Sequence, residues 1–179
     1  MPLIILDRDG VINQDSDNYI KSPEEYHLLP GSVEAIARLN QAGYTVAVAT
    51  NQSGIGRGLY DLETLEQIHA KLENALAAVG AHVDGIFFCP HTPEEQCDCR
   101  KPAPGLLQQI SEHFAMPLIG VPMVGDALRD LQAARAVGAS PMLVRTGKGM
   151  RTLERGEELD DVPVFDDLTA VVDALLADQ

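Results

Sequence analysis

The chain has 179 residues, of which 27 are acidic and 13 basic, giving a formal charge of −14. This length suits one domain with a core of its own, and no apolar run approaches the roughly 18 residues that a membrane-spanning helix needs. The excess negative charge opposes that of nucleic acids and acidic membranes, so neither is an expected partner. We therefore expect a single globular domain over residues 1–179 with a small-molecule partner.

The first ten residues, MPLIILDRDG, have no basic region and no small-residue cleavage site. Such a start does not resemble an export signal, so a cytosolic location is expected. We also expect the protein to be a monomer.

Alternating strands and helices are predicted along the whole chain. Short continuous apolar runs predict buried strands at 3–6, 45–49, 85–89, 123–124 and 142–144. Apolar residues at helical spacing predict helices at about 33–40, 62–79, 106–114, 128–137 and 168–176. This alternation favours a doubly wound α/β fold, with a mainly parallel sheet covered by helices on both faces.

Four segments have neither a continuous apolar run nor apolar residues at helical spacing, and they are expected to be irregular: 15–30, 51–61, 90–104 and 146–163. In open α/β sheets, ligands bind outside the carboxyl ends of the strands, and the first three segments lie near such ends. No long insertion follows the first or third strand, so a large cap domain is not expected and the site should be open.

Two acids follow the first predicted strand directly, in the sequence Asp7-Arg8-Asp9-Gly10. Side chains at i and i+2 point to the same side, which would place Asp7 for nucleophilic attack and Asp9 for proton transfer or metal binding. The alternative is an ordinary turn, since Asp and Gly favour turns.

Further polar groups follow two other strands. Thr50 begins a polar segment after the second strand, Gly125-Asp126 ends a later one, and Arg100-Lys101 lies between them. A hydroxyl, a lysine and three carboxylates at strand ends are the groups that phosphoryl transfer through an aspartyl-phosphate requires.

These residues resemble the four motifs of the haloacid dehalogenase superfamily of phosphohydrolases, and the resemblance covers nearly the whole chain. It implies that Asp7 attacks phosphorus, that Asp9 protonates the leaving oxygen and later activates water, and that Thr50 and Lys101 hold the phosphoryl oxygens. It also implies that Mg²⁺ is bound by Asp7, the backbone carbonyl of Asp9, and Asp126.

Several other polar residues have no assigned chemical role, and for one of them, Asp130, two interpretations are open. Asp130 is either a partner of the metal-site residues or an acid on a helix surface. Residues 146–149 are interpreted as a surface loop near the site. The remaining histidines have no partner at metal or triad spacing and are expected to be surface or satisfied core residues: His27, His69, His82 and His113.

All three cysteines and one histidine lie within eleven residues, in the pattern C-x-H-x5-C-x-C. Three thiolates and an imidazole make a closed tetrahedral set for structural zinc, whereas a disulfide would leave one thiol over. We expect zinc to order the segment 89–99 and thereby position Arg100 and Lys101. The expected ligands are Cys89, His91, Cys97 and Cys99.

The zinc motif narrows the resemblance to two families of phosphatase, which act on D-glycero-D-manno-heptose 1,7-bisphosphate at C7 or on histidinol phosphate. The segments 7–13 and 50–58, including Arg57, are similar to the heptose family. The short gap between His91 and Cys97 is typical of the histidinol family. Ala127 departs from the heptose family, many of whose members have lysine there.

The heptose family is favoured, which implies a role in supplying ADP-heptose for the lipopolysaccharide core. A bisphosphate substrate has a second phosphate to hold, and planar guanidinium groups suit that task. Arg57 and Arg100 are therefore expected to bind substrate, although either could instead be a solvated surface arginine. The other expected substrate-binding residues are Asp15, Asn18, Asn51 and Ser53.

Overall fold

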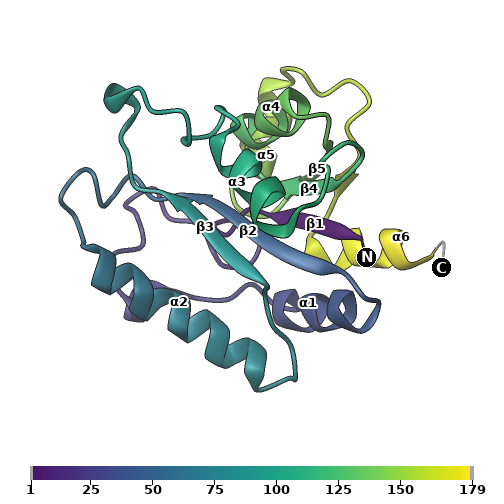
Figure 1. Cartoon of the computed structure of the whole chain (residues 1–179), viewed down its shortest axis with the longest axis horizontal. Coiled ribbons are helices and arrows are strands. Elements are labelled where there is room, and N and C mark those ends of the chain that lie inside the picture. Colours follow the sequence, from purple (N-terminus) through teal and green to yellow (C-terminus); the bar gives the residue numbers. More distant parts are fainter. Residues whose placement is uncertain (1, 178–179) are drawn as a thin grey trace.

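A computed structural model describes residues 2–177 of the chain as one six-stranded sheet with flanking helices (Figure 1). The strands are β1 (Leu3–Leu6), β2 (Thr45–Asn51), β3 (Gly85–Cys89), β4 (Pro122–Gly125), β5 (Ser140–Val144) and β6 (Val164–Phe165). The α-helices are α1 (Ser32–Gln41), α2 (Leu62–Ala77), α3 (Gly105–Phe114), α4 (Leu128–Ala136), α5 (Gly149–Arg155) and α6 (Leu168–Ala177).

The strand order is β3-β2-β1-β4-β5-β6, and every pairing is parallel. The predicted doubly wound α/β class is confirmed. The pleat of β1 divides its buried residues between two cores, with Ile4 and Leu6 on one face and Leu3 and Ile5 on the other. Because both faces are covered, β1 is apolar along its whole length rather than at alternate positions.

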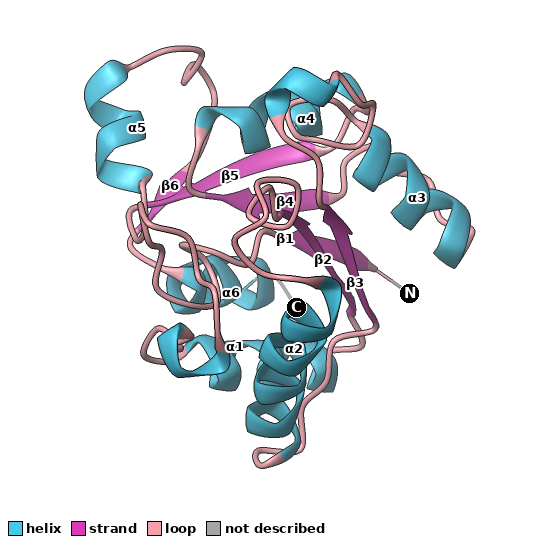
Figure 2. Cartoon of the chain, turned by 90° about the vertical axis from the view of Figure 1, so that its left-hand side faces the viewer, coloured by secondary structure: helices cyan, strands magenta, loops and turns pink. Residues whose placement is uncertain are grey.

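Different helices cover the two faces of the sheet (Figures 1 and 2). The core on one face contains apolar residues of α1, α2 and α6, including Ile36, Leu72 and Val171. The core on the other face contains residues of α3 and α4, including Leu107 and Ala134. No helix among residues 2–177 combines the length and the apolar character needed to cross a membrane.

The predicted irregular segment 146–163 is partly wrong, because it contains α5 and is followed by the two-residue edge strand β6. The two buried residues of α5 are Gly149 and Thr152, neither of which is a large apolar residue. The helix therefore lacks the apolar stripe by which the other helices were predicted. Two short 3-10 helices, Pro23–Glu25 and Pro93–Glu95, also lie in segments expected to be irregular.

The position of the site follows from the strand order. The chain moves outward from β1 through β2 to β3, then returns to the other side of β1 to form β4. Helical connections diverge at this switch point and leave a crevice at the carboxyl ends of β1 and β4. Asp7 follows β1 and Asp126 follows β4, and the Asp7 backbone N–H donates to Val124 O at 2.9 Å. The two carboxylates therefore meet in the crevice.

Candidate active site

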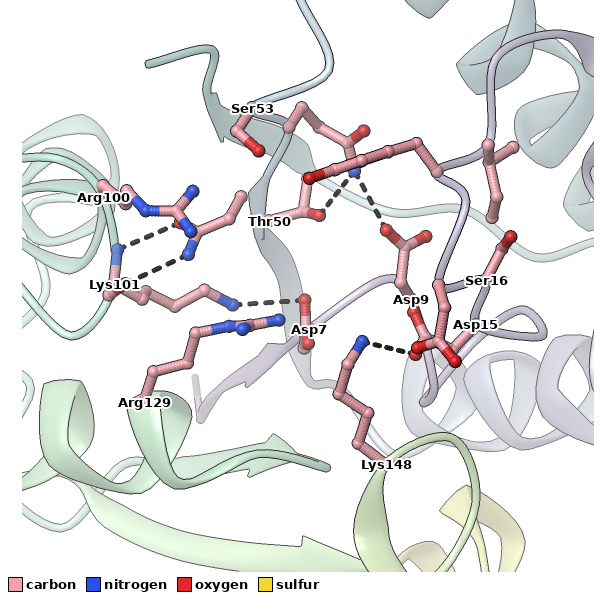
Figure 3. A pocket seen from close by; sticks show the side chains of 15 residues that line it. Asp7, Asp9, Asp15, Ser16, Thr50, Ser53, Arg100, Lys101, Arg129 and Lys148 are labelled. Carbon is pink, nitrogen blue, oxygen red and sulfur yellow. Dashed lines mark hydrogen bonds and ion pairs between the residues drawn. The ribbon is translucent and has the colours of Figure 1, made fainter. Parts of the chain in front are cut away.

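Asp7 lies at the bottom of a cavity of about 210 Å³ at the carboxyl end of the sheet (Figure 3). The adjacent Lys101 is almost fully buried, and its Nζ lies 3.1 Å from Asp7 Oδ1 and 2.7 Å from Asp130 Oδ1. Lys101 Nζ also donates to the carbonyl of Ala49 at 2.7 Å. These three acceptors fix the ammonium group beside the nucleophile predicted from the sequence.

Asp130 is buried, which excludes its interpretation as an acid on the helix surface. Its Oδ2 accepts from the backbone N–H groups of Asp126 and Ala127, both at 3.2 Å. Asp130 therefore ties the start of α4 to Lys101 and acts as a partner of the candidate metal-site residues.

Asp9 is held by side chains from the same turn. Its Oδ1 accepts from Arg8 Nη2 at 2.8 Å and from Asn13 Nδ2 at 2.9 Å. Arg8 is fully buried and is held in turn by His69 of α2, whose Nε2 lies 3.1 Å from Arg8 Nη1. Burial and the Arg8 charge lower the pKa of His69 to about 3, so the ring is a neutral acceptor.

His69 is thus a buried histidine with a hydrogen-bond partner, as one of the two predicted alternatives required. The other three histidines outside the cysteine-containing segment are exposed: His27, His82 and His113.

A second network reaches the other oxygen of Asp9. Gln52 Nε2 donates to Asp9 Oδ2 at 3.2 Å and to Thr50 Oγ1 at 2.9 Å, and Tyr60 Oη donates to Gln52 Oε1 at 2.5 Å. Gln52 thereby connects the proton-transfer candidate with the hydroxyl candidate. No individual role was predicted for Gln52, although its position two residues after Thr50 was an available signal.

The backbone of two loops lies close against the Asp126 carboxylate. A Cβ atom at Gly10 would lie 2.0 Å from Asp126 Oδ2, and one at Gly147 would lie 2.3 Å from the same oxygen. Both glycines have positive φ, at 86° and 58°. Only glycine allows this packing, which places the Lys148 N–H 2.8 Å from Asp126 Oδ2. The segment 146–149, expected to be a surface loop near the site, thus closes one wall of it.

The acidic groups fit a divalent cation. Ligand oxygens of Asp7, Asp126 and Asp130 lie within 4.8 Å of one another, and all three residues are buried. Burial and the Asp130 charge raise the pKa of Asp7 to about 7, and burial and the Asp7 charge raise the pKa of Asp126. A hard cation with oxygen ligands relieves this repulsion, so the residues present fit Mg²⁺.

The pKa of Asp9 moves the other way. Burial opposes its negative charge, but the Arg8 charge and the hydrogen bonds from Asn13, Arg8 and Gln52 outweigh it and lower the pKa. Lys101 is likewise opposed by burial, but Asp130 and Asp7 raise its pKa. The free site therefore contains a charged lysine and an ionised Asp9.

The predicted substrate-binding residues divide into two groups. Four line the cavity: Asp15, Asn51, Ser53 and Arg100. Asn51 also binds the backbone of Lys101: its Nδ2 donates to the Lys101 carbonyl at 3.1 Å, and its Oδ1 accepts from the Lys101 N–H at 3.0 Å. Asn18 and Arg57 do not line the cavity. Arg57 is exposed at the rim, with its guanidinium carbon 5.6 Å from the ring centre of Tyr19.

Several residues that line the cavity were not predicted as site residues. Lys148 forms an ion pair with Asp15 across it, and Arg129 extends from the start of α4 (Figure 3). Lys148 belongs to the segment 146–149, which was expected to be a loop near the site, whereas Arg129 has only a weak signal because it is an isolated basic residue. The cavity is also lined by Ser16, Asp17, Tyr19, Ile20 and Gln52.

The Cys and His cluster has the composition and spacing of a zinc site. Its four ligand atoms lie within 4.8 Å of one another. Four of the separations between ligand atoms are 3.3–3.7 Å, close to the edges, about 3.5–3.8 Å, of a tetrahedron with zinc bonds of 2.0–2.3 Å. Cys89 Sγ and Cys99 Sγ are nearer, at 2.6 Å, and would separate to admit the ion. The structure thus brings together all four ligands predicted from the sequence.

The thiol ionisation also suits metal binding. Burial opposes the Cys97 thiolate, but hydrogen bonds, first from the Arg100 backbone, lower its pKa to about 6. Cys89 and Cys99 have raised pKa values because of burial. One thiolate is thus available near neutral pH, and a bound cation would deprotonate the other two.

The cluster is connected to the active site through the backbone. Cys89 ends β3 opposite Asn51 of β2, and its carbonyl accepts from Gln52 N–H at 2.7 Å. The chain then returns from Cys99 directly to Arg100 and Lys101. The four ligands therefore hold the segment that delivers both cations.

Comparison with known proteins identifies the family. The HAD-hydrolase-like family model matches residues 98–171. The D-glycero-beta-D-manno-heptose-1,7-bisphosphate 7-phosphatase of Pseudomonas aeruginosa is 59% identical over 97% of this chain and 97% of its own length. The chain belongs to this phosphatase family. The enzyme of the same name from Neisseria meningitidis serogroup A is 52% identical over 94% of this chain and 91% of its own length.

Solved structures of the family share the fold. The crystal structure of D,D-heptose 1,7-bisphosphate phosphatase from Bordetella bronchiseptica, complexed with magnesium and phosphate, matches with a TM-score of 0.98 and 55% identity, and all of both chains is covered. The Burkholderia thailandensis enzyme of that name matches with a TM-score of 0.79 and 46% identity over 99% of each chain. The predicted superfamily resemblance is confirmed.

Replacing one zinc ligand is expected to affect catalysis from a distance. Cys97→Ser should lower bound zinc from one equivalent per chain and lower kcat/KM, because the metal orders the segment leading to Arg100 and Lys101. Elemental analysis and phosphate release measure the two effects. Glu94→Gln, an exposed change in the same loop, is the control and should alter neither. Full activity in zinc-free protein would contradict the expectation.

Proposed function

We propose that the chain is a Mg²⁺-dependent phosphomonoesterase that removes the C7 phosphate of D-glycero-D-manno-heptose 1,7-bisphosphate through an aspartyl-phosphate. The observation that carries the proposal is the buried Asp7–Lys101 pair, 3.1 Å apart, at the bottom of an open polar cavity in a member of this family. The family relationship favours this substrate over histidinol phosphate, the alternative considered from the sequence.

In the first step, an Asp7 oxygen attacks phosphorus and the bond from phosphorus to the sugar oxygen breaks. Thr50 Oγ1 and Lys101 Nζ hold the phosphoryl oxygens. Asp9 transfers a proton to the departing sugar oxygen. Its Oδ1 accepts from the two side chains of Arg8 and Asn13, whereas Oδ2 accepts only the longer hydrogen bond from Gln52, so Oδ2 is assigned as the oxygen that exchanges the proton. The negative charge of bound substrate would raise the Asp9 pKa and favour the protonated form.

In the second step, Asp9 Oδ2 removes a proton from water, and the water oxygen attacks phosphorus. The bond between phosphorus and Asp7 breaks, releasing inorganic phosphate and the free carboxylate. The Arg8 contacts suit this half of the reaction, because they favour an ionised Asp9.

Asp7, Asp126 and the backbone carbonyl of Asp9 would hold Mg²⁺. When bound, Mg²⁺ offsets the negative charge that accumulates on the carboxylates and the phosphoryl oxygens. Asp130 and Lys148 N–H hold this acidic group in place from the protein side.

The phosphate that is not cleaved is assigned to Arg100 and Arg57. Arg100 is half-buried and lines the cavity, whereas Arg57 lies at its rim over Tyr19 and contacts Ser53 Oγ at 3.4 Å. Asp15 and Asn18 belong to the same loop as Tyr19, and they are assigned to the sugar hydroxyls.

We further propose that residues 1–179 act as one monomeric unit in the cytosol, with segment 89–99 bound to zinc, in heptose supply for lipopolysaccharide. Three clustered free thiols in place of disulfides support a reducing compartment.

A substrate panel tests the proposed function. Phosphate release should be fastest on heptose 1,7-bisphosphate, slower on fructose 1,6-bisphosphate, and slowest on histidinol phosphate, because only the first combines both phosphates with the heptose hydroxyls. EDTA should stop all turnover and added Mg²⁺ should restore it. Faster turnover of histidinol phosphate would overturn the substrate assignment while leaving the chemistry intact.

Asp7→Asn is expected to abolish turnover with the fold unchanged, because the amide fills the same space but cannot form the acyl-phosphate. Single-turnover assays and circular dichroism measure the two properties. The matched control is Asp166→Asn, an exposed carboxylate paired with Arg145 away from the cavity. Activity within about tenfold of the unchanged protein would remove Asp7 from the nucleophilic role.

Arg100→Ala should penalise the bisphosphate more than the matching heptose 7-monophosphate, because only the former has a second phosphate. A charge-assisted bidentate contact contributes about 1.5–3 kcal/mol, so kcat/KM for the bisphosphate should fall about 10- to 150-fold. The same comparison for Arg57→Ala tests the rim position. Equal losses on both substrates would assign the arginine to the reacting phosphate or to structure.

A further inference from the structure

Arg129 is a basic residue in the cavity that none of the roles above employs. It is the second residue of α4, directly before Asp130, and its side chain extends beside Lys101 toward Asp7 (Figure 3). Ala127, at the start of the same turn, has no charge to contribute. Arg129 is thus the cation that α4 directs into the site.

The Arg129 guanidinium lacks a protein acceptor. Its Nε is buried without a hydrogen-bond partner, and no described carboxylate lies within ion-pair distance of the group in residues 2–177. Three other cations at the site have carboxylate partners: Arg8 is paired with Asp9, Lys101 with Asp7 and Asp130, and Lys148 with Asp15. A buried charged donor without an acceptor is costly unless a ligand supplies one.

The neighbouring carboxylates attract the Arg129 guanidinium electrostatically but form no ion pair or hydrogen bond with it. Burial opposes its charge, but Asp130 and Asp7 outweigh burial and raise its pKa, so it remains a cation. Both oxygens of Asp130 already accept hydrogen bonds, from Lys101 and from backbone N–H groups. An anion that enters the cavity above Asp7 would supply the missing acceptor.

We propose that Arg129 is a catalytic residue that binds a non-bridging oxygen of the phosphoryl group being transferred, an inference that rests on the proposed function. Thr50 and Lys101 approach that group from β2 and from the end of the zinc segment, and Arg129 approaches it from α4. A planar guanidinium can donate to two oxygens of one phosphoryl group. As charge shifts toward Asp7 and the leaving oxygen, Arg129 stabilises the transition state.

The test compares Arg129→Met with Arg155→Met. Arg155 is exposed, carries the same charge and lies in α5, outside the cavity lining. Kinetics are measured on heptose bisphosphate, heptose 7-monophosphate and p-nitrophenyl phosphate, and inorganic phosphate is titrated calorimetrically with Mg²⁺ present. Arg129→Met should lower kcat/KM about 10- to 100-fold on all three substrates and weaken phosphate binding about tenfold, while Arg155→Met should change neither.

A role limited to neutralising the acids predicts different results. Saturating Mg²⁺ would then restore activity to Arg129→Met, and phosphate affinity would be unchanged; either result would overturn the proposal. A loss confined to the bisphosphate would also overturn it, since Arg129 would then bind the other phosphate. If Arg129→Met does not fold, Arg129→Lys retains the charge but lacks the planar pair of donors of a guanidinium, and it should still weaken phosphate binding.

The proposed function can fail separately. Unmodified protein that hydrolyses p-nitrophenyl phosphate but not heptose bisphosphate would refute the substrate, and phosphate titration would still decide the role of Arg129.

Discussion

The site depends on one buried cation, the ammonium group of Lys101 between Asp7 and Asp130. Transfer of charged groups from water into a protein interior is unfavourable unless they are paired and hydrogen-bonded. Here the lysine forms ion pairs with two carboxylates and donates hydrogen bonds to Asp130 and to the Ala49 carbonyl. Removal of one partner would leave an uncompensated buried charge, which typically costs about 3–5 kcal/mol.

Elements remote from one another in the sequence serve this one contact. Asp7 is brought by β1, Asp130 by α4, and Lys101 by a segment with little regular structure. The zinc-ligand cluster holds that segment at one end, and Asn51 holds the Lys101 backbone from β2. A metal bound by this cluster would be coupled to the chemistry although the cluster lies outside the cavity. Its binding energy would replace the core that so short a segment cannot form.

The cavity combines a rigid base with a wall of loops. At the base, Arg8 and His69 fix Asp9, while Gln52 and Tyr60 connect it to Thr50. The walls come from loops after β1, β2, β3 and β5, whose charged residues pair across the opening, as Lys148 does with Asp15. Chemistry common to a superfamily thus rests on strand ends, whereas the loops provide the variation that selects a substrate.

The sequence by itself determined the α/β class and the central strands, and it singled out the motif residues and the cluster of three cysteines and one histidine that could bind zinc. Short apolar runs and ligand spacing are local properties, legible without knowledge of distant contacts. Tertiary structure alone decided the role of Asp130 and of His69, because each depends on a partner dozens of residues away. It also revealed α5, which has no apolar stripe, and Arg129, an isolated arginine in sequence. Whether a charged side chain is solvated or buried beside a nucleophile is decided only when the strand order brings the chain together.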